Sequence, residues 1–251
     1  RPNSQLSLLN RKGVLRNPHP DLVTVLRKSM GLSKLTEGAF DVTVQPLWNL
    51  YAHHAQSGSL PSETEIAKVR RRIGWEHIRI EPEIIYFDRP GMQITLNGVA
   101  QGMAADFAQQ ALEQRGIEDA LIDAGEFNAI GSPMRKDSWH IAVQHPRQAC
   151  HIAKTGLQGR CLSTSGDYAT KFSTDYRHHH LLDPRTGLSP LKLSAVSVAA
   201  PTALEADALS TALFVLGPDK AKEMAESMDS VDALFVSKSG EVSVTNGFPL
   251  V

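Results

Sequence analysis

The spacing of apolar residues predicts helices in the first third of the chain. The apolar positions of the first long helix recur three or four residues apart after an opening proline: Pro20, Leu22, Val25, Leu26 and Met30. This spacing places them on one face of a helix. A polar connection around Ser57 precedes a second, charged helix, which is expected to begin near Pro61 and to end before Gly74. We therefore expect a mostly helical segment over about residues 15–75.

The next helix has a clear beginning and end in the sequence. Asn97 suits an N-cap position, and Gly116 suits the position just after a helix. Apolar residues recur every fourth position in between: Val99, Met103, Phe107 and Ala111. The spacing predicts that these four side chains form a stripe facing the core.

Short strands are expected through the rest of the chain. The strand-like segments are His77–Ile80, Ile84–Phe87, Ala120–Asp123, Trp139–Gln144, Gly159–Ser163, His179–Leu182, Leu193–Ala199, Ala233–Ser237 and Glu241–Thr245. Within Leu193–Ala199, the alternation of side chains over Ala195–Ala199 predicts one buried face and one less buried face.

The fold class follows from the order of these elements. Thr202, with Glu205 three residues later, is a capping-box signature for a strong helix, which ends at Gly217 before a further helix. Strands are separated both by hairpin-length turns and by helices. This pattern predicts an α+β fold, in which a single large domain over residues 1–251 contains a mostly antiparallel sheet packed by helices.

Composition narrows the function classes. The chain has 251 residues, and its 26 Lys and Arg nearly balance its 27 Asp and Glu, which argues against a nucleic-acid partner. Cys150 and Cys161 lack the spacing of metal ligands, so free thiols and one disulfide both stay open. No apolar run reaches transmembrane length. Because the chain begins without Met, we interpret it as a mature or trimmed fragment, which leaves its compartment open.

Two segments carry candidate chemistry for a metal and a phosphate. Asp207 and Thr211 are four residues apart, so a carboxylate and a hydroxyl share one helix face. These are oxygen ligands of the kind that Mg²⁺ takes together with phosphate oxygens. The alternative is that Thr211 bonds to its own helix and Asp207 faces water. The Ser163–Tyr168 segment follows a strand and predicts either a phosphate-holding loop or a polar turn in which Asp167 bonds its own backbone.

Two further features are weaker when taken alone. Gly98 and Gly102 flank the start of the Asn97 helix, where free N–H groups favour an anion. The His179–Gly187 segment places two histidines and an aspartate at a Pro/Gly turn. Histidine is suited to proton transfer near neutral pH, although many histidines in proteins are merely hydrogen-bonded.

Taken together, these segments resemble the ApbE family of FAD:protein FMN transferases. Besides the segments already described, the resemblance includes Ser4–Asn10, Thr36–Asp41, Leu96–Asp106 and Asp123–Glu126. It covers nearly the whole chain with the segments in the right order.

The resemblance implies an enzyme that moves FMN from FAD to a threonine of an acceptor flavoprotein, releasing AMP with the help of Mg²⁺. By position, the Mg²⁺ ligands would be Asp207, Thr211 and the backbone carbonyl of Gly98. His180 matches the family's essential histidine and would take the proton of the incoming threonine, a task suited to a side chain with an unperturbed pKa near ~6.5. Asp183 would either orient that histidine or shape the turn.

The resemblance also implies a site for FAD and a location. The residues lining or bordering the FAD site would be Asn10, Ala39, Phe40, Asp41, Thr95, Gln101, Leu181, Thr164, Ser165 and Gly166. Members of the family are typically exported, which implies a periplasmic protein that contacts a membrane only through a removed N-terminal anchor.

Three positions depart from the family pattern. Many members carry Asp at the position of Thr95, a charged residue at that of Gln101, and glycine at that of Glu126. The Gln101 and Glu126 variants are similar to the branch that includes NosX. Members usually begin with a further strand and helix before the Ser4 region, which this sequence does not include, so we expect weaker FAD binding.

Two other functions stay open on the same scaffold. A FAD pyrophosphatase would use water in place of threonine and would yield FMN and AMP without an acceptor. A non-catalytic maturation factor would bind FAD and release no AMP.

Overall fold

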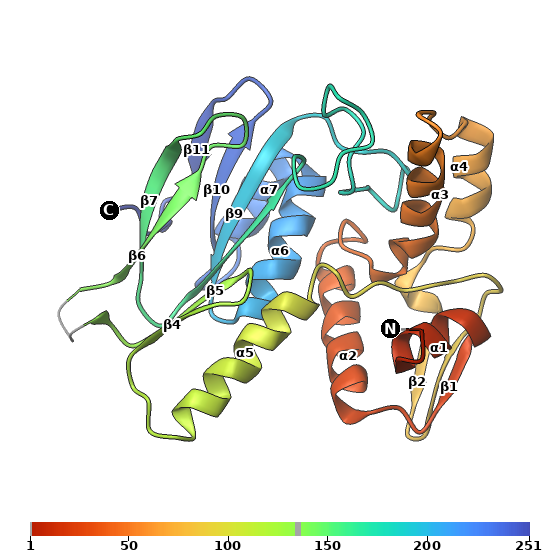
Figure 1. Cartoon of the computed structure of the whole chain (residues 1–251), viewed down its shortest axis with the longest axis horizontal. Coiled ribbons are helices and arrows are strands. Elements are labelled where there is room, and N and C mark those ends of the chain that lie inside the picture. Colours follow the sequence, from red (N-terminus) through yellow and green to blue (C-terminus); the bar gives the residue numbers. More distant parts are fainter. Residues whose placement is uncertain (1, 134–136) are drawn as a thin grey trace. The chain divides into compact units, whose positions relative to one another are not determined.

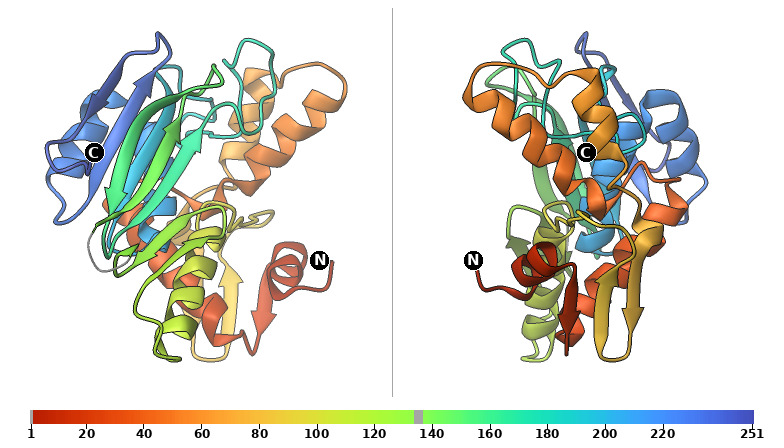
Figure 2. Two further views of the ribbon diagram at one scale, coloured as in Figure 1. Left: turned by 60° about the vertical axis from the view of Figure 1, so that its left-hand side comes forward. Right: turned by 90° about the vertical axis from the view of Figure 1, so that its right-hand side faces the viewer.

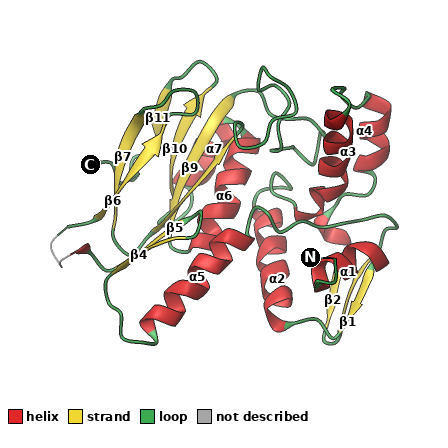
Figure 3. Cartoon of the chain, in the orientation of Figure 1, coloured by secondary structure: helices red, strands yellow, loops and turns green. Residues whose placement is uncertain are grey.

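The chain leaves one folded unit at Asn97, enters a second, and returns to the first for residues 170–189 (Figure 1). The computed structural model describes residues 2–133 and 137–251. The first unit consists of Arg1–Leu96 and Thr170–Ser189, and the second of Asn97–Ala169 and Pro190–Val251. Each unit combines helices with strands (Figure 3). Every strand pairing in the described residues is antiparallel, so the predicted α+β class with antiparallel sheets is confirmed.

The first unit surrounds a small sheet with helices. Its elements are α1 (Gln5–Lys12), β1 (Val14–Arg16), α2 (Pro20–Leu35), the 3-10 helix η1 (Val42–Val44), α3 (Gln45–Gln56), α4 (Glu63–Arg70), the 3-10 helix η2 (Trp75–His77), β2 (Ile78–Glu81) and β3 (Ile84–Phe87). The strand order is β1-β3-β2. The predicted charged helix is confirmed as α4, which begins with a capping box between Ser62 and Glu65.

Residues 170–189 are held in the first unit by an aromatic anchor. The Tyr51 side chain on α3 is 2% exposed, and its hydroxyl donates a hydrogen bond of 3.0 Å to the carbonyl of Gly187. The Tyr51 ring also stacks on Phe172 at 5.4 Å between centroids. Leu182 joins the same apolar cluster. The predicted strand over His179–Leu182 is wrong, because only an isolated bridge between Lys171 and His179 forms there.

The second unit is built on a six-stranded sheet in the order β11-β10-β9-β8-β5-β4. Its elements are α5 (Ala100–Glu113), β4 (Ala120–Asp123), β5 (Phe127–Ile130), β6 (Trp139–Gln144), β7 (His151–Leu157), β8 (Cys161–Gly166), β9 (Leu193–Ala200), α6 (Ala203–Leu216), α7 (Pro218–Glu226), β10 (Asp232–Ser237) and β11 (Val242–Val244). The sequence did not predict β1, β5 or β7, and β8 extends three residues beyond its predicted end. Thr202 caps α6 as predicted, with its hydroxyl accepting from Glu205 N–H.

Strand β9 is buried on both of its faces. Helix α6 packs on one face, while Ala195 and Ala199 on the other face join a cluster with Ile141 and Val143 of the β6–β7 hairpin. The hairpin and the blue helices lie on opposite sides of the sheet (Figure 2). All of Leu193–Ala200 is therefore buried, and the predicted alternation of buried and less buried positions is wrong. Small residues suit a strand covered on both sides.

The predicted core-facing stripe of α5 is confirmed at Val99, which is fully buried, and is wrong at Phe107; Met103 and Ala111 are half-buried. Phe107 is 44% exposed, whereas Gly102 and Ala105 are buried, because α5 and α6 approach each other closely at Gly102. A Cβ atom added to Gly102 would lie 2.3 Å from the carbonyl oxygen of Ala203. Asn97 also does not cap α5, which starts at Ala100 without a side-chain cap.

Two open questions from the sequence are answered by the described residues. Cys150 is exposed, Cys161 is buried, and both are free thiols. No helix in residues 2–133 and 137–251 combines the length and the apolar character needed to span a membrane.

We predict that Gly102→Ala lowers the free energy of unfolding by about 1–3 kcal/mol, because the new methyl group must push backbone atoms of α6 away. Gly31→Ala is the matched control, since Gly31 lies on α2 with nothing within 4 Å of an added Cβ. The control should be neutral or gain up to about 1 kcal/mol from helix propensity. Urea denaturation measures both changes, and equal effects of the two substitutions would contradict the prediction.

Candidate functional site

A buried carboxylate on α6 forms the centre of the candidate site in the second unit. Asp207 is 5% exposed, and its Oδ2 accepts a hydrogen bond of 3.1 Å from Gly102 N–H. Burial raises the pKa of Asp207 to about 7, and the hydrogen bond from Gly102 opposes this rise. Within the described chain, no Lys or Arg forms an ion pair with Asp207. The carboxylate is therefore buried without a cationic partner.

Hydroxyl groups of β8 and α6 lie beside this carboxylate. The Ser165 Oγ is 2.7 Å from Ser210 Oγ and 3.1 Å from Thr211 Oγ1. Because strand side chains alternate, Ser163 and Ser165 share the face of β8 on which α6 packs. Ser210, rather than Thr211, bonds back to its own helix, donating 2.9 Å to the carbonyl of Asp207. Thr211 thus faces the strand, and the alternative in which it bonds to its own helix is wrong.

Glu126 is a second buried carboxylate close to Asp207. It directly precedes β5, and the pairing of Phe127 with Leu162 places it next to Ser163 of β8. Glu126 is 7% exposed, and its Oε2 has no hydrogen-bond partner. Its pKa is raised to about 8, first by burial and then by the negative charge of Asp207, while the Ser163 hydroxyl and the Thr164 N–H oppose the rise.

Sequence reasoning did not assign Glu126 or Ser210 to the site. The sequence marked Glu126 only as a departure from a common glycine, because Asp207, the carboxylate near it in the structure, lies 81 positions away. The available signal was the Glu126 carboxylate directly after Gly125, in the turn between β4 and β5. For Ser210, the signal was its position next to Thr211 on a strongly apolar helix.

The oxygen set around Asp207 fits a hard divalent cation. Carboxylate and hydroxyl oxygens are the donors that Mg²⁺ accepts, and phosphate oxygens of a nucleotide commonly complete its shell. The described residues contain no cluster of three or more His, Cys, Asp or Glu side chains arranged for a metal. A cation here would thus depend on few carboxylates plus neutral oxygens. Gly98 lies in the turn before α5, and the role of its carbonyl stays a prediction.

The other predicted residues of the second unit surround this centre in different ways. Gln101 extends over the hairpin turn, and its Nε2 would be 2.3 Å from a Cβ added to Gly125. Thr164 Oγ1 lies 2.7 Å from Ser197 Oγ, on the opposite face of β8 from Ser165. Gly166 is the last residue of β8, so the predicted loop begins later than expected.

The candidate base, His180, belongs to the first unit. Its backbone N–H donates 2.9 Å to the carbonyl of Thr170, and its ring Nδ1 lies 3.1 Å from the same oxygen. A carbonyl can only accept, so Nδ1 carries the proton and Nε2 is the basic nitrogen. The backbone of Thr170 therefore selects the tautomer that a general base needs.

Asp183 closes the turn through Arg185. Its Oδ1 accepts from Arg185 N–H and Nε–H, and its Oδ2 accepts from Nη2–H, all at 2.9 Å. The backbone carbonyl of Asp183 also accepts from the N–H groups of Thr186 and Gly187. These bonds support the turn, one of the two roles that the sequence left open for Asp183, and its role as a catalytic residue stays a prediction.

The predicted FAD residues of the first unit are also structural residues. Asn10 makes two hydrogen bonds with the backbone of Ile94, of 2.8 Å and 2.7 Å. Asp41 accepts from the N–H and the hydroxyl of Thr43 and from Trp75 N–H, and burial raises its pKa to about 6. The remaining four are buried or bonded through the backbone. Ala39, Phe40 and Leu181 are at most 6% exposed, and Thr95 N–H donates to the carbonyl of Val42. Their contact with FAD stays a prediction.

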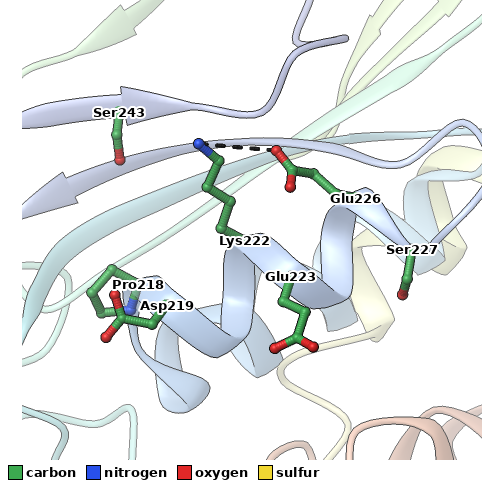
Figure 4. A pocket seen from close by; sticks show the side chains of 7 residues that line it. All are labelled: Pro218, Asp219, Lys222, Glu223, Glu226, Ser227 and Ser243. Carbon is green, nitrogen blue, oxygen red and sulfur yellow. Dashed lines mark ion pairs between the residues drawn. The ribbon is translucent and has the colours of Figure 1, made fainter.

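Two further hollows in the described surface are lined by residues other than Asp207. One lies along α7 and holds the 3.9 Å ion pair of Lys222 with Glu226 (Figure 4). Its lining consists of solvent-exposed charged side chains without convergent buried groups. The other, of about 460 Å³, lies in the first unit beside Asp41 and is lined by Arg70 and Arg185 among others. Neither contains a buried carboxyl oxygen without a hydrogen-bond partner, such as Glu126 Oε2 near Asp207.

Comparisons with known proteins identify the family. The model of the ApbE family matches residues 1–235. A FAD:protein FMN transferase of Escherichia coli K12 is 34% identical over 233 residues, which cover 88% of this chain and 65% of the relative. One of Haemophilus influenzae is 32% identical over 240 residues, covering 89% of this chain and 69% of the relative.

Solved structures agree with the sequence matches. The ApbE protein of Thermotoga maritima superposes with a TM-score of 0.90 at 28% identity, covering 97% of this chain and 82% of the other. The flavinyl transferase ApbE of Pseudomonas stutzeri gives 0.84 at 32% identity, covering 98% and 80%. The chain belongs to the ApbE family. It spans 65% of the length of the Escherichia coli relative.

We predict that the protein in EDTA loses stability as the pH rises from about 5 to about 9. The folded state keeps a proton on Glu126 up to a pKa of about 8, whereas the unfolded chain releases it near the ordinary value of 4.5. The folded state therefore binds more protons, and the free energy of unfolding falls through this window. Glu126→Gln should reduce the loss between pH 6 and pH 9 by at least about 1 kcal/mol, measured by urea denaturation. An identical pH dependence in both proteins would contradict the prediction.

Proposed function

We propose that the protein transfers FMN from FAD to a threonine of an acceptor flavoprotein, releases AMP, and depends on Mg²⁺. The names of its relatives support the FAD and protein substrates. The single observation that carries the metal dependence is the buried Asp207 carboxylate among hydroxyl oxygens, without a cationic side chain to balance it.

The residues of the second unit would hold the cation. Asp207 supplies a negative oxygen and Thr211 a neutral one, while Ser165 keeps the threonine hydroxyl in position through its 3.1 Å contact. When bound, Mg²⁺ neutralises phosphate charge and stabilises the departing AMP. The Gly102 N–H holds Asp207 Oδ2 at 3.1 Å and so keeps the carboxylate in one orientation.

His180 of the first unit would accept the proton of the acceptor threonine at Nε2. Its Nδ1–H is directed to the carbonyl of Thr170 at 3.1 Å, so the acceptor nitrogen is the one that can meet a substrate hydroxyl. The threonine oxygen then forms its bond to the phosphorus of the FMN portion as the bond to the AMP oxygen breaks. The AMP leaves with the electron pair of that bond.

The remaining parts of the proposal rest on the family resemblance. They include the FAD contacts of Asn10, Ala39, Phe40, Asp41, Thr95, Gln101, Thr164, Gly166 and Leu181, and the periplasm as the place of the reaction.

We predict that the protein, FAD, Mg²⁺ and a competent acceptor domain yield an acceptor heavier by one FMN, with one AMP released for each. Intact-mass spectrometry and chromatography of nucleotides measure the two products. EDTA should abolish both. FMN and AMP formed at the same rate without acceptor would instead show a FAD pyrophosphatase, and FAD binding without AMP would show a maturation factor.

We predict that His180→Ala lowers the rate of FMN transfer on the order of 10²–10⁴-fold, because the threonine loses its general base. FAD binding, measured by quenching of flavin fluorescence, should stay unchanged. The neighbouring His178→Ala serves as control and should keep most of the rate. A similar loss in both variants would contradict the role of His180 and indicate a general disturbance of the 170–189 segment.

A further inference from the structure

Glu126 is a buried carboxylate that has no role in the proposed reaction. It is 7% exposed, and its Oε2 has no hydrogen-bond partner. A buried ionised carboxylate is unfavourable unless a cation or several donors compensate it. In the described chain, no Lys or Arg forms an ion pair with Glu126. The Ser163 hydroxyl and the Thr164 N–H are the groups that favour its charge.

The hairpin turn before β5 directs Glu126 toward α6. Gly125 N–H donates 3.1 Å to Asp123 Oδ1, and Ala124 N–H donates 3.2 Å to the carbonyl of Glu126. Gly125 has a φ of +93°, where a side chain is strained, and Gln101 fills the space that a Cβ would need. The turn is thus closed by Gln101 on one side, and Glu126 lies where the charge of Asp207 acts on it.

Two buried carboxyl groups that lie close together can both ionise at neutral pH only if they share a counter-charge. Asp207 comes from α6 and Glu126 from the end of the β4–β5 hairpin, so the fold brings together carboxylates that are distant in sequence. The hydroxyls of Ser165 and Thr211, which are 3.1 Å apart, offer neutral oxygen atoms, and Thr211 lies on the same helix face as Asp207. A divalent cation would balance both carboxylates and use the unpartnered Oε2.

We propose that Glu126 is a second carboxylate ligand of the divalent cation held at Asp207. This inference rests on the proposed function only in its use of the Asp207 metal centre. A cation with two protein carboxylates is bound more tightly before the nucleotide arrives than a cation with one.

The test measures cation binding directly, with Mn²⁺ as the probe and no nucleotide present. Free Mn²⁺ is counted by electron paramagnetic resonance in titrations of the wild type, Glu126→Gln, Asp207→Asn and Glu205→Gln. Glu205 is the matched control, because it is an acidic residue of the same helix as Asp207 that serves the helix cap, a role that glutamine also fills.

We expect Glu126→Gln and Asp207→Asn each to weaken Mn²⁺ binding by about tenfold or more, and Glu205→Gln to leave it unchanged. A second readout is thermal unfolding with and without MgCl₂. The wild type should gain in melting temperature with MgCl₂, and Glu126→Gln should lose most of this gain. Without metal, Glu126→Gln should melt at or above the wild-type temperature, which would also show that it folds.

The outcomes separate this inference from the proposed function. Wild-type binding by Glu126→Gln together with weak binding by Asp207→Asn would overturn the role of Glu126 and leave the Asp207 centre standing. Wild-type binding by both variants, or no binding by the wild type at millimolar Mn²⁺, would overturn the metal centre itself. An equal loss of Mn²⁺ affinity in Glu205→Gln would show that any removed negative charge weakens binding. That result would overturn the assignment of Glu126 as a ligand.

Discussion

The burial of α6 between the sheet and α5 is the constraint on which the candidate metal centre depends. The helix packs on β8 and β9, and α5 approaches it so closely that only glycine fits at position 102. The same close approach lets the Gly102 N–H reach Asp207. Packing and polar chemistry are thus joined at one point, because the backbone group that makes the helix contact also orients the carboxylate.

This arrangement gives up stability for binding capacity. Asp207 and Glu126 are both buried, and burial raises the pKa of each carboxyl group. The negative charge of Asp207 raises the pKa of Glu126 further. A domain selected for stability alone would place apolar or neutral side chains at these positions. Carboxylates retained in such surroundings, without Lys or Arg partners in the described chain, are the kind of local conflict that marks functional sites.

The first unit follows a different principle, in which a segment without regular structure is held by side chains. Tyr51 bonds to Gly187 and stacks on Phe172, and Asp183 closes its turn through Arg185. Those contacts fix both ends of residues 170–189, so that the Thr170 carbonyl can meet the ring of His180. The sequence predicts a strand over His179–Leu182 because two apolar residues follow the histidines. In the structure, hydrogen bonds to the carbonyl of Thr170 fix the conformation of His180 instead.

The sequence by itself determined the elements whose signals are local. The capping residue Thr202 and Gly217 after α6 were sufficient to place that helix. The order of the elements was sufficient for the α+β class, and the spacing of Asp207 and Thr211 made them candidates. Only the tertiary structure decided which faces are buried: β9 is covered on both sides, and α5 turns Gly102 rather than Phe107 to the core. It also decided that Asp183 belongs to Arg185 and that Glu126 lies near Asp207. These contacts join residues that are far apart in the chain. The periodicity of apolar residues predicts that a face is buried, but it does not identify the element that covers that face.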